Sequence, residues 1–134
     1  MQKILIDCDP GHDDAAAILY GAAHLDLVGI TTVYGNQTVE KTTANALSLM
    51  TLLGLDVPVA QGCAGPLNGT VSHGGDVHGK TGIDGADLPA PDRGVEPLHA
   101  VDFIIEMASR HRGELVLCPI GPFTNVGLAL RKEP

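Results

Sequence analysis

Four aspartates lie close together near the start of the chain, at positions 7, 9, 13 and 14. Carboxylates at this spacing repel one another, and the repulsion raises their pKa values unless a cation is bound. Carboxylate oxygens are the ligands that hard metal ions such as Ca²⁺ and Mg²⁺ prefer. Residues 7–14, which we call the acidic elbow, therefore predict a cation site.

The residues on either side of the acidic elbow predict a strand before it and a helix after it. The apolar run at residues 4–6 is typical of a strand buried in a parallel sheet. Pro10 and Gly11 then turn the chain. Apolar residues at helical spacing follow, at Ala15, Ile18, Leu19 and Ala22. The aspartates should thus lie at the carboxyl edge of a sheet, where α/β folds bind ligands.

Further along, strands are predicted at residues 26–33, 57–60 and 114–119, with Pro58 favouring a sheet edge. Helices are predicted from an N-cap at Thr38 to residue 53, from Pro97 as first helical residue, and from about residue 123. The third of these helices should bury Val126, Leu128, Ala129 and Leu130, and the second should bury Val101, Ile104, Ile105 and Ala108. Residues 61–97 show no periodicity, which indicates a functional loop or an unrecognised element.

This order of elements predicts an α/β fold, with an open and mostly parallel sheet and flanking helices. The chain of 134 residues is long enough for one such domain, over residues 1–134. Polar turns follow three of the predicted strands, at residues 7–14, 35–37 and 120–122. Because parallel strands end at the same edge, these turns should converge on one ligand.

Composition limits the possible partners. A net charge of −8 argues against nucleic acid or an anionic membrane, since neither attracts an acidic protein. Cys8, Cys63 and Cys118 have no paired spacing, so we expect reduced and mostly buried thiols in a cytoplasmic protein. Neither a secretory signal nor a membrane-spanning segment is expected from the sequence.

Three interpretations of the acidic elbow compete before any family is considered. An EF-hand loop fails because Gly11 and Ile18 occupy positions that must supply oxygen ligands. A phosphatase of the haloacid dehalogenase type would use Asp7 as nucleophile and Asp9 as acid, but it leaves Asp13 and Asp14 without a role. Favourable interaction with a helix dipole explains an acid in the first turn and does not explain Asp7 and Asp9.

The sequence resembles the inosine–uridine-preferring nucleoside hydrolases in four separate motifs. These are Asp-Cys-Asp-Pro-Gly-His-Asp-Asp-Ala at 7–15, Ile-Thr-Thr-Val-Tyr-Gly-Asn-Gln-Thr at 30–38, Val-His-Gly-Lys-Thr-Gly at 77–82 and Pro-Ile-Gly-Pro-Phe-Thr-Asn at 119–125. Their order and spacing agree with the N-terminal portion of that family's Rossmann-like fold. A single Asp-Asp pair would be a weak signal, whereas four motifs in order are a strong one.

The resemblance implies Ca²⁺-dependent hydrolysis of the N-glycosidic bond of purine or pyrimidine ribonucleosides, in salvage or catabolism. Asp9 matches the acid that binds Ca²⁺ and takes a proton from the attacking water, and Asp14 matches a bidentate Ca²⁺ ligand. The residue at Ile120 matches one that lends its backbone carbonyl to the metal. Asp7 is expected to support these groups.

The resemblance also implies the substrate contacts. Asp13 and Asn36 match residues that bind the ribose, and His78 matches a histidine near the nucleobase. A transition-metal site of His73, Asp76 and His78 is an alternative based on ligand type alone. His12 occupies a variable position of the first motif and is assigned no role.

Family members supply a further Ca²⁺-ligating aspartate, the leaving-group acid and more ribose ligands from a later segment that has no counterpart here. We therefore expect either a ribonucleoside hydrolase, which in the full-length family is a homo-oligomer, or a non-catalytic piece that binds metal or ribose. The second alternative includes a fragment that needs the missing part. Ca²⁺ requires roughly six to eight oxygen ligands. The carboxylates of Asp9 and Asp14 and the Ile120 carbonyl supply fewer than this number.

Overall fold

Four parallel strands form one sheet in the computed structural model, in the order β3-β2-β1-β4. They are β1 (Lys3–Cys8), β2 (Asp26–Thr32), β3 (Val59–Gln61) and β4 (Leu115–Pro119). The structure describes residues 1–74 and 77–134 in full, and of residues 75 and 76 it describes the backbone alone. The predicted α/β fold with an open parallel sheet is confirmed, and β3 lies at a sheet edge as Pro58 indicated.

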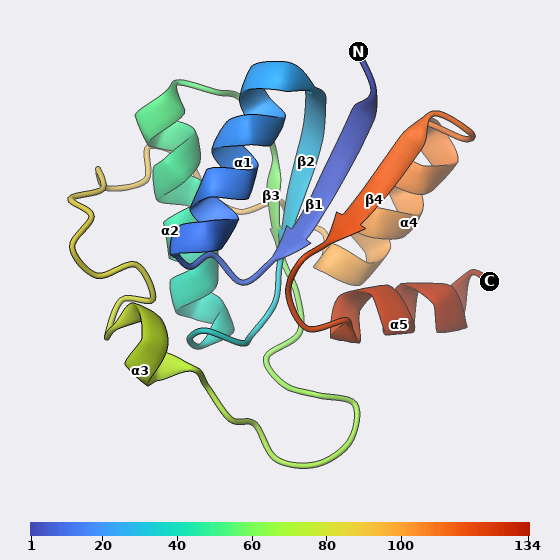
Figure 1. Cartoon of the computed structure of the whole chain (residues 1–134). Coiled ribbons are helices and arrows are strands. Elements are labelled where there is room, and N and C mark those ends of the chain that lie inside the picture. Colours follow the sequence, from blue (N-terminus) through green and yellow to red (C-terminus); the bar gives the residue numbers. More distant parts are fainter.

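Helices cover both faces of this sheet (Figure 1). Helices α1 (His12–His24) and α2 (Val39–Leu53) pack on one face, and α4 (Ala100–Arg110) and α5 (Thr124–Lys132) pack on the other. A single turn, α3 (Gly75–His78), lies below the carboxyl ends of the strands. The sheet therefore forms the middle of three layers, and its carboxyl edge is left to the connecting loops.

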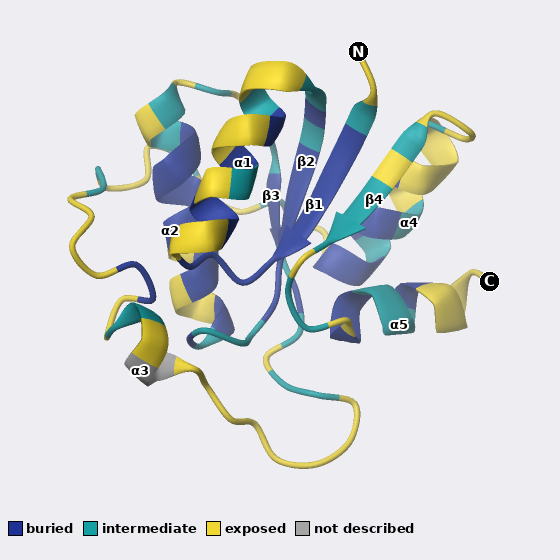
Figure 2. Ribbon diagram, in the orientation of Figure 1, coloured by how far each residue is buried: buried dark blue, intermediate teal, exposed yellow. Residues whose placement is uncertain are grey.

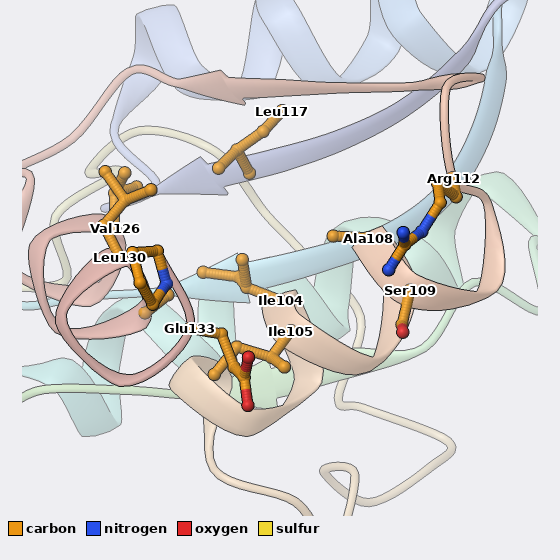
Figure 3. A pocket seen from close by; sticks show the side chains of 11 residues that line it. Ile104, Ile105, Ala108, Ser109, Arg112, Leu117, Val126, Leu130 and Glu133 are labelled. Carbon is orange, nitrogen blue, oxygen red and sulfur yellow. The ribbon is translucent and has the colours of Figure 1, made fainter.

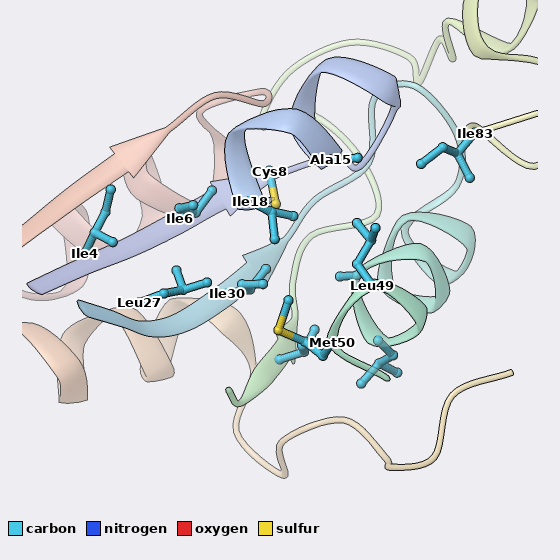
Figure 4. Packing of buried hydrophobic residues seen from close by; sticks show 13 residues of the cluster. Ile4, Ile6, Cys8, Ala15, Ile18, Leu27, Ile30, Leu49, Met50 and Ile83 are labelled. Atoms are coloured by element: carbon cyan, nitrogen blue, oxygen red, sulfur yellow. The ribbon is translucent and has the colours of Figure 1, made fainter. Parts of the chain in front are cut away.

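Strand β1 is the centre of the core because side chains on both of its faces are buried. Ile4, Ile6 and Cys8 point toward α1 and α2, where they meet Ile18 and other apolar residues of the first core cluster (Figure 4). Leu5 points the other way, toward α4 and α5. This alternation is that of a strand covered on both faces, and it makes β1 the most deeply buried strand in Figure 2.

The ends of α2 agree with the prediction. Thr38 is the N-cap residue, and Gly54 ends the helix in the left-handed conformation, with φ of 62°. One face of this helix is buried, and it comprises Val39, Thr43, Ala46, Leu47 and Met50. In α1 the prediction was wrong for Leu19, which is exposed, because the face toward β1 runs through Asp14, Ile18 and Gly21.

The prediction for α4 was wrong in its start and in part of its buried face. Helix α4 begins at Ala100, and the ring of His99 caps it by accepting from the backbone N–H of Val101 at 3.2 Å. Val101 and Ile104 are buried as predicted, Phe103 and Met107 are buried as well, and Ala108 is exposed. The buried face of α4 starts at Ala100 and is rotated around the helix relative to the predicted face, because this is the side that packs on the sheet. In α5, Leu130 was expected in the core and is exposed.

Residues 61–97 proved to be a long connection with one short helix, α3, which the sequence did not predict. Its far part is anchored by Ile83, which is buried in the first core cluster. Within the described residues, none of the helices combines the length and apolar character required to cross a membrane.

Candidate functional site

The three polar turns converge at the carboxyl edge of the sheet, as predicted. The backbone N–H of Asn36, which follows β2, donates to Asp9 Oδ2 at 2.8 Å. The N–H of Ile120, which follows β4, donates to the carbonyl oxygen of Asp7 at 2.8 Å. Asp7 and Pro119 are also register partners across β1 and β4. The turns after β1, β2 and β4 thus form one site.

Asp9 occupies a narrow space between two glycines. A Cβ atom on Gly121 would lie 2.7 Å from Asp9 Oδ1, and a Cβ on Gly35 would collide with Asp9 Oδ2. The pKa of Asp9 is raised to about 7, because burial and the charge of Asp14 raise it more than the hydrogen bond from the Asn36 N–H lowers it. A carboxylate with a pKa near neutrality, at the mouth of a ligand site, is suited to accept a proton.

Asp14 faces into the site from the first turn of α1. Its Oδ2 accepts from the backbone N–H of Gly11 at 3.1 Å and from Asn36 Nδ2 at 3.4 Å. Its Oδ1 is buried and has no hydrogen-bond partner among the described atoms. Burial raises the pKa of this carboxyl as well. One Asn36 side chain therefore touches both acids, and the unpaired oxygen with the raised pKa values fits a bound cation.

Asp7 is fully buried on the opposite side of β1 from Cys8. Its Oδ1 accepts from Thr31 Oγ1 at 2.6 Å and from Asn125 Nδ2 at 2.8 Å, while its Oδ2 is buried without a partner among the described atoms. Burial raises its pKa, and the two hydrogen bonds lower it. The hydrogen bonds of the Asp7 side chain thus link β1 to β2 and to α5, which is a supporting role.

Asp13 and His78 lie together at the outer side of the site. The Asp13 side chain is 84% exposed, and its Oδ1 is 3.6 Å from His78 Nε2. Helix α3 carries His78 to this place, and the N–H of Gly74 donates to the Gly35 carbonyl at 2.9 Å. The structure thus divides the four aspartates into an inner pair, Asp9 and Asp14, an outer Asp13 and a buried Asp7.

Two polar residues of this region were not assigned roles from the sequence. Asn125 is completely buried, donates to Asp7 Oδ1 and the Thr32 carbonyl, and accepts from the Cys63 N–H at 2.9 Å. Its position in the fourth motif, in the first turn of α5, was the available signal. His12 is the second, and its ring contacts His78.

The described residues contain no cluster of three or more His, Cys, Asp or Glu side chains arranged to hold a metal ion. Asp9 and Asp14 are the carboxylates that lie closest to Asn36, and any cation bound by them would need further oxygen ligands. In the transition-metal alternative, the Asp76 side chain lies outside the described residues. The cysteines are free thiols, and burial raises the pKa of Cys8 well above its usual value, which makes it unreactive.

A separate apolar pocket lies between α4, α5 and β4 (Figure 3). It has a volume of about 420 Å³, and Ile104, Leu117 and Val126 lie in its wall with Arg112 and Glu133. None of the acidic elbow residues lines it. The pocket is therefore separate from the acidic elbow.

The parallel sheet, with buried carboxylates where β1 ends, defines an α/β protein whose polar turns meet at the carboxyl edge, the edge at which such folds bind ligands. The family model described as inosine-uridine preferring nucleoside hydrolase matches residues 4–134. The chain belongs to this family, as its four motifs indicated.

Relatives and solved structures agree with this membership. The pyrimidine-specific ribonucleoside hydrolase RihB of Escherichia coli K12 is 42% identical over 99% of this chain and 43% of its own length. A purine-preferring ribonucleoside hydrolase from Gardnerella vaginalis superposes with a TM-score of 0.92 at 36% identity, over 99% of this chain and 44% of that one. A plant nucleoside hydrolase gives a TM-score of 0.86 at 33% identity, over 99% and 43%. The chain thus spans less than half the length of these proteins.

Proposed function

We propose that this chain carries the catalytic base and part of the metal and ribose site of a Ca²⁺-dependent nucleoside hydrolase. The reaction would release the free base and ribose from purine or pyrimidine ribonucleosides. The observation that carries the proposal is the inner pair, because Asp9 and Asp14 are buried, share contacts with Asn36 and have raised pKa values. Buried acids of this kind are concentrated at functional sites.

Each residue has a role that its surroundings support. Asp9 accepts a proton from the water whose oxygen forms a bond to the C1′ carbon of the ribose. The bond between C1′ and the base nitrogen breaks, and its electron pair leaves with the base. The transition state carries positive charge on the sugar, which the carboxylates stabilise.

Asp9, Asp14 and the backbone carbonyl of Ile120 would hold the metal. When bound, Ca²⁺ supplies positive charge that lowers the pKa of water and orients hydroxyl groups. Asp13, Asn36 and His78 would bind the nucleoside, with exposed Asp13 available to a ribose hydroxyl. Only the backbone of Ile120 would take part in metal binding, so the identity of its side chain should matter little.

The test is calorimetry with Ca²⁺, followed by assays of inosine and uridine hydrolysis by the full chain. We expect Asp9→Asn to lower hydrolysis by roughly 10²-fold or more, since general acid–base catalysis contributes at least that factor. Asp14→Asn should weaken Ca²⁺ binding. The control is Asp87→Asn, which changes an exposed aspartate in the loop and should leave both measurements unchanged. An Asp9→Asn variant that hydrolyses nucleosides as fast as the unsubstituted chain would contradict the role of Asp9 as the base.

A second candidate is a chain that binds metal or ribose without turnover. It rests on the two carboxylates of the site, to which the described residues add no third His, Cys, Asp or Glu side chain placed to hold a metal ion. This candidate predicts a calorimetric signal with Ca²⁺ and no release of base from either nucleoside. A cytoplasmic location, a homo-oligomeric state and a single domain over residues 1–134 remain predictions that accompany both candidates.

A further inference from the structure

His12 has no part in the proposed reaction, yet its ring has two specific contacts. Its Nδ1 lies 2.8 Å from His78 Nδ1, and its Nε2 lies 2.9 Å from the backbone carbonyl oxygen of Asp84. The two rings are tilted by 35° with centroids 5.1 Å apart. His12 therefore joins the helix that begins at the acidic elbow to the segment that carries His78.

The carbonyl oxygen of Asp84 determines where the proton of His12 lies. A carbonyl oxygen only accepts hydrogen bonds, so His12 Nε2 must carry the hydrogen that it donates. A neutral imidazole has one N–H, which leaves His12 Nδ1 with a lone pair. Two lone pairs would repel at 2.8 Å, so the hydrogen between the rings must come from His78 Nδ1. Neutral His78 then has its own lone pair on Nε2.

The surrounding contacts make this arrangement rigid. Asp84 is held in a tight turn, where its carboxylate accepts from the N–H groups of Lys80 at 3.0 Å and Thr81 at 2.9 Å. The N–H of Asp84 donates to the His78 carbonyl at 2.9 Å. On the other side, a Cβ atom on Gly11 would come within 2.9 Å of the His78 ring. His78 is therefore packed between the elbow and this turn.

Two contacts favour the opposite proton position. The backbone N–H of His12 lies 3.4 Å from His78 Nδ1 and would donate to a lone pair there. The Asp13 carboxylate lies 3.6 Å from His78 Nε2 and would accept from a proton there. Both contacts are longer than the ring contact of 2.8 Å, so the His12 ring determines where the His78 proton lies while that ring is present. Without the ring, the backbone N–H would remain as the partner, and the proton of His78 would move to Nε2.

We propose that His12 is a positioning residue that keeps the proton of neutral His78 on Nδ1, so that His78 Nε2 presents a lone pair beside Asp13. Two acceptors then face the outer side of the site, 3.6 Å apart. A ligand group placed there must donate hydrogen bonds, as a ribose hydroxyl or an N–H group of a base does. This consequence for the ligand rests on the proposed function, whereas the proton position does not.

The test is a long-range proton–nitrogen NMR spectrum of the full chain without metal or nucleoside. The buffer should be about two pH units above the usual histidine pKa of ~6.5, so that free imidazole is neutral. One set of histidine ring signals should disappear in the His78→Gln variant, and that set is assigned to His78. In the unsubstituted chain, we expect the His78 Nδ1 to be protonated and its Nε2 to be free.

Two substitutions of His12 separate positioning from packing. His12→Leu removes the acceptor, and we expect the His78 proton to move to Nε2. His12→Asn keeps an acceptor oxygen at the place of Nδ1, so it should retain the proton on His78 Nδ1, which also covers the case in which His12→Leu unfolds. The matched control is His24→Leu on the same helix, an exposed residue whose ring lies against Tyr20. It should leave the His78 pattern unchanged.

A proton on His78 Nε2 in the unsubstituted chain would overturn the proposal, as would the same His78 pattern in His12→Leu and in the unsubstituted chain. Loss of the Nδ1 proton in His12→Asn would overturn it too. These spectra need neither Ca²⁺ nor turnover. A chain that fails to hydrolyse nucleosides would refute the proposed function and leave the proton position as measured.

Discussion

The carboxylate of Asp9 has room in this structure only because two of its neighbours lack side chains. Gly35 and Gly121 belong to the turns after β2 and β4, and both approach the carboxylate closely. The backbone of Gly121 does not have a positive φ, so a larger residue is excluded there by lack of space alone. Glycine at this position is therefore a requirement of the site, since a methyl group would occupy the space of Asp9 Oδ1.

Gly121→Ala should push the Asp9 carboxylate out of place. Its Cβ would lie 2.7 Å from Asp9 Oδ1 and 3.1 Å from the Asp9 backbone nitrogen. We expect Ca²⁺ affinity to fall by roughly tenfold, equivalent to about 1.4 kcal/mol, measured by calorimetry. The control is Gly127→Ala in α5, where the nearest atom is 3.7 Å away and where alanine should stabilise the helix by about 0.5–1 kcal/mol. Equal Ca²⁺ affinity in the two variants would contradict this account.

Asp7 should make stability depend on pH. Burial raises its pKa above the usual value, so the folded state binds the proton more tightly than the unfolded state. The resulting stabilisation is complete below the unfolded pKa of about 3.9 and is lost as the pH rises through the folded pKa. At neutral pH the protein therefore bears the cost of a buried carboxylate.

Asp7→Asn removes this dependence because an amide does not titrate. We expect the stability of the variant relative to the unsubstituted chain to improve from pH ~3 to pH ~8, by on the order of 1 kcal/mol. The measurement is denaturant unfolding at a series of pH values in a chelating buffer. A difference that stays constant or shrinks as the pH rises would refute the raised pKa.

At the scale of elements, the first turn of α5 is tied to the sheet by one side chain. Asn125 reaches Asp7 on β1, Thr32 at the end of β2 and Cys63 after β3. The other end of α5 is exposed, as Figure 2 shows. Since Ala129 is the one apolar residue of this short helix that is buried, the hydrogen bonds of Asn125 should contribute much of its attachment.

Asn125→Ala should destabilise the chain by roughly 3 kcal/mol, because it removes three hydrogen bonds, two of them buried. The loss would appear as a lower midpoint in denaturant unfolding. Asn68→Ala is the matched control, since Asn68 is exposed in the loop after β3, and it should change stability by about 0.5 kcal/mol or less. A loss for Asn125→Ala no larger than that control would show that α5 is held by other contacts.

At the scale of the whole molecule, the sheet is open at β4. In the part of the chain that the structure describes, β4 pairs with β1 alone, and Val116 is 46% exposed. The apolar pocket of Figure 3 lies beside this edge and is partly lined by Leu117 of β4. An unpaired strand with apolar side chains is a surface on which protein chains associate.

Val116→Lys should therefore reduce self-association of this chain. We expect sedimentation velocity to show larger species of the unsubstituted chain as concentration rises, and a shift toward the monomer in the variant, because a lysine on an edge strand opposes pairing. Val95→Lys changes a valine of nearly equal exposure, 45%, that lies outside the sheet. If both variants behave alike, the β4 edge is not the associating surface.

Much of this protein was determined by its sequence. Apolar periodicity and turn residues act over a few neighbouring positions. They predicted the four strands, the helices other than α3, the Thr38 and Gly54 ends of α2 and the position of the acidic elbow. The meeting of three turns at one edge followed from the alternation of strands and helices, because parallel strands end together. The four motifs added the family.

Tertiary structure alone decided how the acidic elbow divides. Neighbouring residues on a helix point about 100° apart, so Asp13 and Asp14 cannot both point inward toward Asp9. The packing of Ile18 on β1 turns Asp14 inward and leaves Asp13 in solvent beside His78. The contacts of Asn125 with Asp7 and of His12 with His78 join residues that are more than 60 positions apart. No local pattern specifies such contacts, because they exist only once the sheet has brought the turns together.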